Sequence, residues 1–453
     1  MAVALEMTAR DIAQGEARKP ASGRVAYVNA RLLDPASGLD VKGGLVTDGE
    51  AIAALGPEIT AKGQPEGTAI VDCGGHCLAP GLVDMRVQVR EPGEEHKETI
   101  ASASRAAVAG GVTAMVCLPN TEPLIDDVAV LEFVARRARE VKLCKIFAYA
   151  TVTKGLTGEA LTEMGLLNEA GAVGFTDGTA AVANPQVMRR ALSYARAFDA
   201  LVIQHPEEKL LAGTGAMNEG EIATRLGLPG IPGAAELIMV ERDLRLVEMT
   251  QGRYHAAHVS TAAALDEVRQ AKRRGLRVTC DTAPPYFALN ESAVGDYRTF
   301  AKLSPPLRSE DDRRAVVEAL KDGTIDVIAS DHAPQDQDSK RVPFVQAEFG
   351  TSGLETLLAV SLELYHGGHL PLLKVLELMT ARPADLLRLP LGRLKPGAPA
   401  DLVLFDLDRP WQIDADLLVS KSKNSAFDER PVQGVVLRTV VDGRAVFVRD
   451  AAG

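Results

Sequence analysis

The stretch YHAAHVSTAAALDEVRQAKRRGLRVTC, residues 254–280, decides the fold class. Residues 254–259 form an apolar strand candidate, residues 262–274 form a helical stretch, and residues 277–280 form a second apolar strand candidate. Repetition of a strand and a helix is typical of a parallel sheet, because the helix returns the chain to the edge where the next parallel strand begins. This unit therefore predicts an α/β protein.

The same alternation extends over the centre of the chain. Helical stretches at residues 128–141, 185–198 and 234–250 separate further apolar strand candidates, which lie at residues 114–118, 145–150, 173–176, 200–204 and 325–329. Eight such units close into a (β/α)8 barrel of the TIM type, and a doubly wound open sheet is the structural alternative. No GxGxxG motif follows a first strand, which weighs against a dinucleotide-binding version of the open sheet.

Short β-rich runs with turn residues occupy both ends of the chain. They cover residues 24–29, 44–48, 51–55 and 69–72 on the N-terminal side, and residues 400–405 and 434–447 on the C-terminal side. Asp442-Gly443 divides the last run and is typical of a β-hairpin turn. We predict that residues 24–78 and 391–449 form one composite β domain and that residues 79–390 form the barrel.

The composition predicts a soluble, cytoplasmic protein. The chain has 453 residues, of which 46% are hydrophobic and 25% are charged, and its formal net charge is −11. This acidic balance argues against a nucleic-acid-binding surface, so small molecules or other proteins are the expected partners. No apolar run reaches the roughly 18 residues of a membrane span, and residues 1–19 lack a signal-peptide core. The five cysteines have no CxxC spacing, and we expect them to be free and buried.

Polar side chains follow several of the predicted strands. In a (β/α) barrel, the chemistry lies at the carboxyl ends of the strands. The places that stand out there are residues 84–90, Asn120, Asp177, His205, His258 and Asp331. Two imidazoles and two carboxylates that converge are suitable zinc ligands, and zinc can activate a bound water for hydrolysis. Each of these residues alone is more often a hydrogen-bonded structural residue, so the prediction of a metal site rests on their combination.

Six longer segments resemble dihydroorotase. They are GLVDMRVQVREPGEEHKETI (81–100), GFTDG (174–178), HVST (258–261), SPPLRSEDDR (304–313), DGTIDVIASDHAP (322–334) and GRLKPGAPADLVLFD (392–406). The similarity extends over almost the whole chain. It implies a cyclic-amide hydrolase of pyrimidine biosynthesis in the amidohydrolase superfamily, with a composite β domain and a zinc centre in the barrel. The resemblance also implies that Arg90 and Asn120 bind the substrate.

The first of these segments departs from the family at two metal positions. The family has Asp-x-His-x-His, whereas Asp84 is followed here by Arg86 and Gln88. Arginine is permanently protonated and has no lone pair to donate, and glutamine offers only a weak carbonyl oxygen. Two substrate-side positions also differ, because Ser304 stands where the family usually has Asn and Gln335 stands where it has a second His.

The other metal position is matched by later residues. The family builds it from an aspartate and two histidines, and Asp177, His205 and His258 match all three, with Asp331 beside them. Three protein ligands and one open position are the pattern of a catalytic zinc site. The resemblance therefore implies at most one zinc ion. A guanidinium at Arg86 would repel that ion if it came within a few ångströms.

Two classes of function follow from these residues. One is a catalytically impaired, dihydroorotase-like structural partner of aspartate carbamoyltransferase in an oligomer, because the scaffold segments, including SKSKN (420–424), are intact while metal ligands are lost. The other is an active enzyme with one zinc ion that interconverts N-carbamoyl-L-aspartate and dihydroorotate, with Asp331 as general acid/base. Another cyclic amidohydrolase is a third alternative.

The direction of the Arg86 side chain links these alternatives. Side chains alternate along a strand, so positions 86 and 88 should both face the barrel interior. A buried guanidinium must be paired, and the nearest carboxylates are the former metal ligands. We therefore expect Arg86 to contact Asp331 or Asp177. The alternative is that its flexible stem carries the charge out to the barrel rim.

Overall fold

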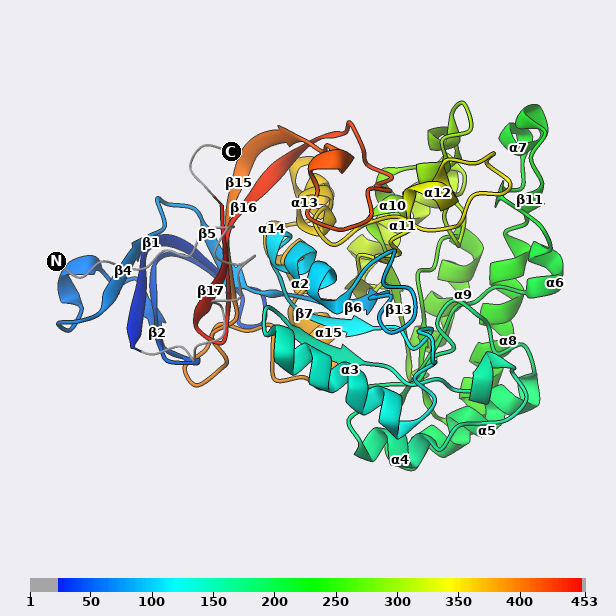
Figure 1. The fold of residues 1–453 in the computed structure, drawn as a ribbon, viewed down its shortest axis with the longest axis horizontal. Coiled ribbons are helices and arrows are strands. Elements are labelled where there is room, and N and C mark those ends of the chain that lie inside the picture. The colour runs from blue at the N-terminus through cyan, green and yellow to red at the C-terminus, as the bar shows by residue number, and fades with distance from the viewer. Residues whose placement is uncertain (1–22, 450–453) are drawn as a thin grey trace.

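A ring of parallel strands occupies the middle of the chain in the computed structural model, which describes residues 23–449 (Figure 1). One sheet joins β6 (Leu82–Val87), β7 (Val112–Cys117) and β8 (Lys145–Ala148). A second sheet joins β9 (Leu201–Gln204), β12 (Arg253–Ala256), β13 (Val278–Thr282) and β14 (Val327–Ile328).

Isolated parallel bridges close the ring. Phe175 pairs with Ala150, just after β8, and with Val202 in β9, so the segment around Phe175 serves as the eighth strand. Val87 of β6 pairs with His332, which follows β14, and this pair joins the last strand to the first. Each strand enters the ring in the same direction, so the carboxyl ends of all eight meet at one mouth.

Helices on the outside of the ring connect the strands. The longer ones are α2 (Ile100–Ala109), α3 (Val128–Val141), α5 (Pro185–Arg196), α8 (Ala234–Thr250), α9 (Ala262–Arg273), α11 (Glu310–Asp322) and α13 (Leu357–His366). Capping side chains mark where several of them begin: Asp127, Asn184, Thr261 and Ser309 each accept a hydrogen bond from a backbone N–H in the first turn.

Shorter elements fill the connections. They are α4 (Met164–Glu169), α6 (Lys209–Ala212), β10 (Met217–Asn218), α7 (Glu221–Leu226), β11 (Gly230–Ile231), α10 (Pro284–Ala288), α12 (Gln337–Lys340), α14 (Leu372–Glu377) and α15 (Ala381–Leu386). The elements from α6 to β11 and the loop that contains α12 lie on the mouth side, where they supply residues to the cavity described below.

Strands from both ends of the chain form one further sheet, which lies beside the barrel (Figure 1). Its order is β17-β16-β15-β5-β1-β2-β3, and β4 pairs with β1. Its strands are β1 (Arg24–Asp34), β2 (Leu39–Asp48), β3 (Ala51–Gly56), β4 (Ala69–Asp72), β5 (Cys77–Pro80), β15 (Leu402–Gln412), β16 (Pro431–Val441) and β17 (Arg444–Val448). The join is antiparallel, with Leu402 opposite Pro80 and Phe405 opposite Cys77.

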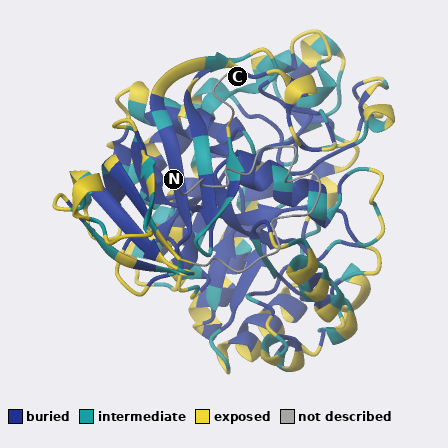
Figure 2. Cartoon of the chain, turned by 60° about the vertical axis from the view of Figure 1, so that its left-hand side comes forward, coloured by how far each residue is buried: buried dark blue, intermediate teal, exposed yellow. Residues whose placement is uncertain are grey.

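The sheet and the barrel share one hydrophobic core. Leu33, Cys77 and Phe405 from the sheet belong to one cluster of buried side chains, which also contains Ile100, Met115 and other barrel residues. Figure 2 shows this continuity, because buried segments run from the sheet strands into the barrel. Removing either terminal segment would therefore expose apolar surface on the barrel.

The expected fold class is confirmed: the chain is an α/β protein with a TIM-type barrel and a β sheet built from both termini. The domain limits at residues 78/79 and 390/391 stay a prediction. All five cysteines are free and buried, as expected. Within residues 23–449, no helix has the length and apolar character needed to span a bilayer.

Truncation of Phe405 tests the shared core. This side chain is fully buried on β15 against the barrel. We expect Phe405→Ala to lower the free energy of unfolding by about 3–5 kcal/mol, because it removes buried apolar area and leaves a cavity. Urea denaturation followed by circular dichroism measures the change. Leu417→Ala, at a side chain that is 79% exposed, is the control and should change the stability by no more than about 0.5 kcal/mol. Equal effects of the two variants would contradict the shared core.

Candidate active site

The barrel mouth gathers the polar residues that follow the strands. Arg86 lies at the end of β6, and His205 directly follows β9. His258 comes shortly after β12, and Asp331 comes shortly after β14. All four are joined in one chain of hydrogen bonds. The parallel direction of the strands explains this convergence of residues that are far apart in the sequence.

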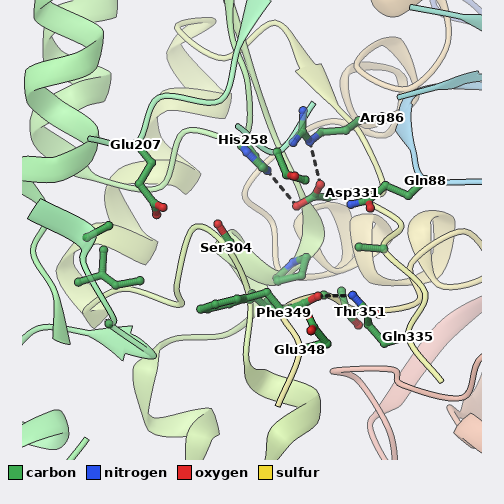
Figure 3. Close-up of a pocket in the computed structure, with 18 of the residues that line it drawn as sticks. Arg86, Gln88, Glu207, His258, Ser304, Asp331, Gln335, Glu348, Phe349 and Thr351 are labelled. Atoms are coloured by element: carbon green, nitrogen blue, oxygen red, sulfur yellow. Dashed lines mark hydrogen bonds and ion pairs between the residues drawn. The ribbon is translucent and has the colours of Figure 1, made fainter. Parts of the chain in front are cut away.

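The Arg86 guanidinium points into the barrel and pairs with Asp331, as the sequence predicted (Figure 3). Its Nε donates to Asp331 Oδ1 at 2.8 Å, and its Nη2 donates to the carbonyl of Gly178 at 3.4 Å. The side chain is only 2% exposed. The rim position considered as the alternative is therefore not adopted, and a fixed positive charge occupies the centre of the mouth.

Two histidines extend the chain from Asp331 toward the cavity. Asp331 Oδ2 lies 3.0 Å from His258 Nδ1, and His258 Nε2 lies 2.7 Å from His205 Nδ1. His205 Nε2 is 3.5 Å from the hydroxyl of Ser304. An ionised carboxylate only accepts, so Nδ1 of His258 carries the proton. A neutral His258 then accepts at Nε2 from His205 Nδ1, and Nε2 of His205 faces both the Ser304 hydroxyl and Glu207 Oε1, the latter at 3.9 Å.

Burial and the neighbouring charges support this proton arrangement. Burial, followed by the positive charge of Arg86, lowers the pKa of His258 from 6.5 to about 4, so its ring is neutral at pH 7. Burial alone would raise the pKa of Asp331. The hydrogen bond from His258 and the guanidinium of Arg86 outweigh burial, and the pKa of the Asp331 carboxyl lies far below its ordinary value. Asp331 is therefore ionised.

Asp177 lies apart from this chain. Its Oδ1 accepts from the backbone N–H groups of Val152 and Thr153 at 2.8 and 2.9 Å, and its Oδ2 accepts from the Thr153 hydroxyl at 2.5 Å. Of the two carboxylates expected as partners of Arg86, Asp331 is the one it contacts, and its other contact is to the carbonyl of Gly178. Burial raises the pKa of Asp177. The Asp177 carboxylate therefore holds the loop that follows β8.

These residues, as they are placed, do not fit the zinc ion that the family resemblance implies. The two imidazoles are hydrogen-bonded to each other, and the two oxygens of Asp331 are bound by Arg86 and His258. Over residues 23–449, no three His, Cys, Asp or Glu side chains are grouped so that they could hold a metal ion. The metal assignment of Asp177, His205, His258 and Asp331 stays a prediction.

Of the two predicted substrate-binding residues, one lines the cavity and the other does not. Arg90 lines the cavity, where its Nη1 donates to Glu94 at 2.6 Å and its Nε donates to the carbonyl of Pro334 at 3.2 Å. Asn120 is not among the residues that line the cavity. Its amide donates to Gln88 Oε1 at 3.2 Å, and Gln88 lines the cavity. Their role in binding substrate stays a prediction.

A cavity of about 320 Å³ opens over this chain of residues (Figure 3). Its floor includes Arg86, His258 and Asp331. The segment from α6 to β11 contributes one side, and residues 333–351 contribute another, on which the Gln335 amide donates to the Phe349 carbonyl at 2.8 Å. A volume of this size suits a small organic molecule.

Sequence reasoning missed the residues that hold the sides of the cavity. Arg308 is buried, and its guanidinium donates to Ser260 Oγ at 3.1 Å, to Asn218 Oδ1 at 3.0 Å and to the Ile231 carbonyl at 2.9 Å. It thereby fixes the segment with β10 and β11 to the end of β12. Its place in the SPPLR motif was the available signal, but the motif alone does not say what Arg308 contacts.

Comparisons with known proteins agree with the sequence motifs. A family profile described as "Dihydro-orotase-like" matches residues 75–264. A protein named "Dihydroorotase" from Anaplasma phagocytophilum is 50% identical over 429 residues, which are 93% of this chain and 95% of that protein. The chain belongs to the dihydroorotase family. Another relative of that name, from Pelobacter propionicus, is 48% identical over 93% of this chain and 99% of its own length.

Solved structures share the fold of this family member. The L-hydantoinase (dihydropyrimidinase) from Arthrobacter aurescens superposes with a TM-score of 0.83 at 24% identity, over 94% of this chain and 96% of the other. The dihydropyrimidinase from Brevibacillus agri NCHU1002 superposes with a TM-score of 0.80 at 20% identity, over 94% and 95%. At these identities the similarity establishes the barrel and its accompanying β domain.

The low pKa of His258 predicts how stability changes with pH. The folded pKa is about 4 and the ordinary value is 6.5, so between these values the unfolded chain binds a proton that the folded chain does not. The free energy of unfolding should therefore fall as the pH is lowered through this window. We expect His258→Gln to show a shallower fall than the wild type in urea denaturation at a series of pH values. His96→Gln, at a side chain that is 63% exposed, should follow the wild type. A wild-type slope in His258→Gln would contradict the assignment.

Proposed function

We propose that this chain is a dihydroorotase-like protein of pyrimidine biosynthesis that is catalytically impaired, and that it acts as a structural partner of aspartate carbamoyltransferase. The observation that carries the proposal is the ion pair between Arg86 and Asp331 in the centre of the barrel mouth. The guanidinium stands where two family histidines would hold a metal ion, and it engages the carboxylate that would act as general acid/base.

The state of the other predicted ligands also supports this proposal. A zinc ion at His205 and His258 would have to break the hydrogen bond between the two rings. It would also have to draw Asp177 away from Thr153 and Val152, which satisfy both of its oxygens. Binding zinc would cost the buried Asp177 carboxylate three hydrogen bonds, and this loss would offset part of the free energy of metal binding. The positive charge of Arg86 would oppose the ion in the same space.

The scaffold supports a role that does not depend on chemistry. The sheet from both termini, the barrel and the cavity are intact, and the buried core is continuous between them. A protein that is selected for assembly and not for catalysis is expected to keep its fold while its metal ligands change. The partner, aspartate carbamoyltransferase, comes from the family resemblance, and a small molecule that fits the cavity is a further possible ligand.

The similarity to proteins named dihydroorotase favours a second candidate. At 50% identity over 93% of the chain, an active enzyme would interconvert N-carbamoyl-L-aspartate and dihydroorotate. It would use one zinc ion at Asp177, His205 and His258, with Asp331 as general acid/base and Arg90 and Asn120 on the substrate. Another cyclic amidohydrolase is the remaining alternative. These candidates require the ligands to rearrange from the positions described above.

Zinc content and turnover separate the two candidates. We expect the purified wild type to contain at most one zinc ion per chain, measured by inductively coupled plasma mass spectrometry. We also expect it to show little ring closure of N-carbamoyl-L-aspartate. Arg86→His with Gln88→His should raise zinc uptake, because it removes the guanidinium and adds two imidazoles. The matched control is Arg139→His with Gln186→His, at exposed positions, which adds the same groups away from the mouth. Two zinc ions in the wild type, with ordinary turnover, would refute the proposal.

Association with aspartate carbamoyltransferase is a separate test. We expect the full chain and the aspartate carbamoyltransferase of the same organism to elute together in size-exclusion chromatography, with a mass above that of either protein alone. Ovalbumin in place of the carbamoyltransferase controls for non-specific association. Separate elution at concentrations well above the micromolar range would contradict the structural role and leave the question of zinc untouched.

A further inference from the structure

One side of the cavity is a loop that leaves the barrel after β14 and returns before α13. We call residues 333–352 the cavity wall. It contains α12, and Ala333, Gln335, Phe349 and Thr351 of this loop line the cavity. Its ends are paired by one parallel bridge between His332 and Thr351, and the Ala333 N–H donates to the Thr351 carbonyl at 2.8 Å. The rest of its shape depends on side chains that bind its backbone.

A single side chain binds both ends of the cavity wall. Asn424 lies in a segment between β15 and β16, far from the wall in the sequence, and it is only 1% exposed. Its Oδ1 accepts from the N–H of Gln335 at 3.1 Å and from the hydroxyl of Ser352 at 2.9 Å. Its Nδ2 donates to the carbonyls of Ala333 at 3.3 Å and Gly350 at 3.0 Å. All four hydrogen-bonding positions of the amide are used, two at each end of the wall.

A lysine binds the middle of the same wall. Lys340 of α12 is 2% exposed, and its ammonium donates to the carbonyls of Thr299 at 3.1 Å and Glu348 at 2.6 Å. Lys302 lies with its Nζ 4.5 Å from the centre of the Phe349 ring and donates to the Val345 carbonyl at 2.9 Å. The middle of the wall is thus bound to Thr299 and Lys302, which lie outside it, and its two ends are held by Asn424.

The segment that carries Asn424 also reaches the neighbour of Asp331. We call residues 418–427 the strap. Ser420 of the strap donates to Glu98 Oε2 at 2.5 Å, and the Lys421 N–H donates to Glu98 Oε1 at 3.3 Å. Glu98 is fully buried and lies 3.7 Å from Nε2 of His332. The strap therefore contacts both Glu98, which precedes α2, and the start of the cavity wall.

We propose that Asn424 is a positioning residue for the cavity: the strap, which lies outside the barrel part of the chain, holds the two ends of the cavity wall together and thereby places Gln335 and Phe349 over the barrel mouth. The inference deepens the proposed function, because the cavity is the site at issue there. It does not depend on whether the site is catalytic. Loosening of the strap opens the cavity on this side.

Asn424→Asp tests the inference with little change in shape. The new side chain keeps the acceptor for the Gln335 N–H and the Ser352 hydroxyl, but it places an oxygen against the carbonyls of Ala333 and Gly350 in place of two N–H donors. We expect hydrogen exchange in peptides covering residues 334–350 to accelerate by about tenfold or more, because two buried acceptors lose their donors. Exchange in the peptides of β1, β2 and β3 should not change.

A matched variant and a pH series separate positioning from a general loss of stability. Asn184→Asp makes the same change at the exposed N-cap of α5, where only the side-chain oxygen is used, and it should leave exchange unchanged everywhere. Burial next to two carbonyls raises the pKa of the carboxyl introduced by Asn424→Asp. At about pH 5 its protonated form regains one donor, so the difference from the wild type at the same pH should shrink.

The outcomes decide the inference independently of the zinc result, because exchange is measured on the full chain without ligand. Unchanged exchange at residues 334–350, or acceleration spread evenly over the whole chain, would overturn it. If Asn424→Asp does not fold, Ser352→Ala is measured in its place. It removes one partner of the Asn424 amide, so a smaller acceleration confined to residues 334–350 is expected, and its absence would equally overturn the inference.

Discussion

The buried ion pair between Arg86 and Asp331 constrains the whole barrel mouth. A guanidinium stays charged under all ordinary conditions, and a side chain that is only 2% exposed cannot share its charge with water. It must have a carboxylate beside it, because an unpaired buried charge costs several kcal/mol, on the order of 3–5. Asp331 is that carboxylate, and its second oxygen then receives the proton of His258. The orientation of His258 in turn fixes the hydrogen bond that it makes with His205.

The sequence was sufficient for the fold because the decisive signals are local. Apolar runs end in polar residues at each strand, and the helices at residues 128–141 and 234–250 have the limits expected from their composition. The Asp442-Gly443 turn joins β16 to β17, as its dipeptide predicts. The direction of Arg86 was also predictable, since alternation along β6 turns positions 86 and 88 to the same side.

The finer structure of the site depends on contacts that no local pattern encodes. Asp177 follows its strand as expected, yet its carboxylate is held by Thr153 from the preceding loop. Asn424 binds the backbone of a loop that is far from it in the chain. Lys340 binds the backbone of the irregular loop in which it lies. Such contacts follow from the three-dimensional course of two loops, which composition and periodicity do not determine.

The Arg86 guanidinium stabilises the barrel mouth by its charge. Carboxylates at the mouth of a family barrel need a positive partner in a site that excludes water, and a metal ion is one way to provide it. Arg86 provides the same charge from within the chain, bound covalently to β6 and aimed at Asp331. A guanidinium can stabilise a carboxylate, but it cannot lower the pKa of a bound water as zinc does. Stability and hydrolytic chemistry, which one ion supplies together in a metal centre, are separable in this barrel. Under the proposed function, the side chain at position 86 supplies the first without the second.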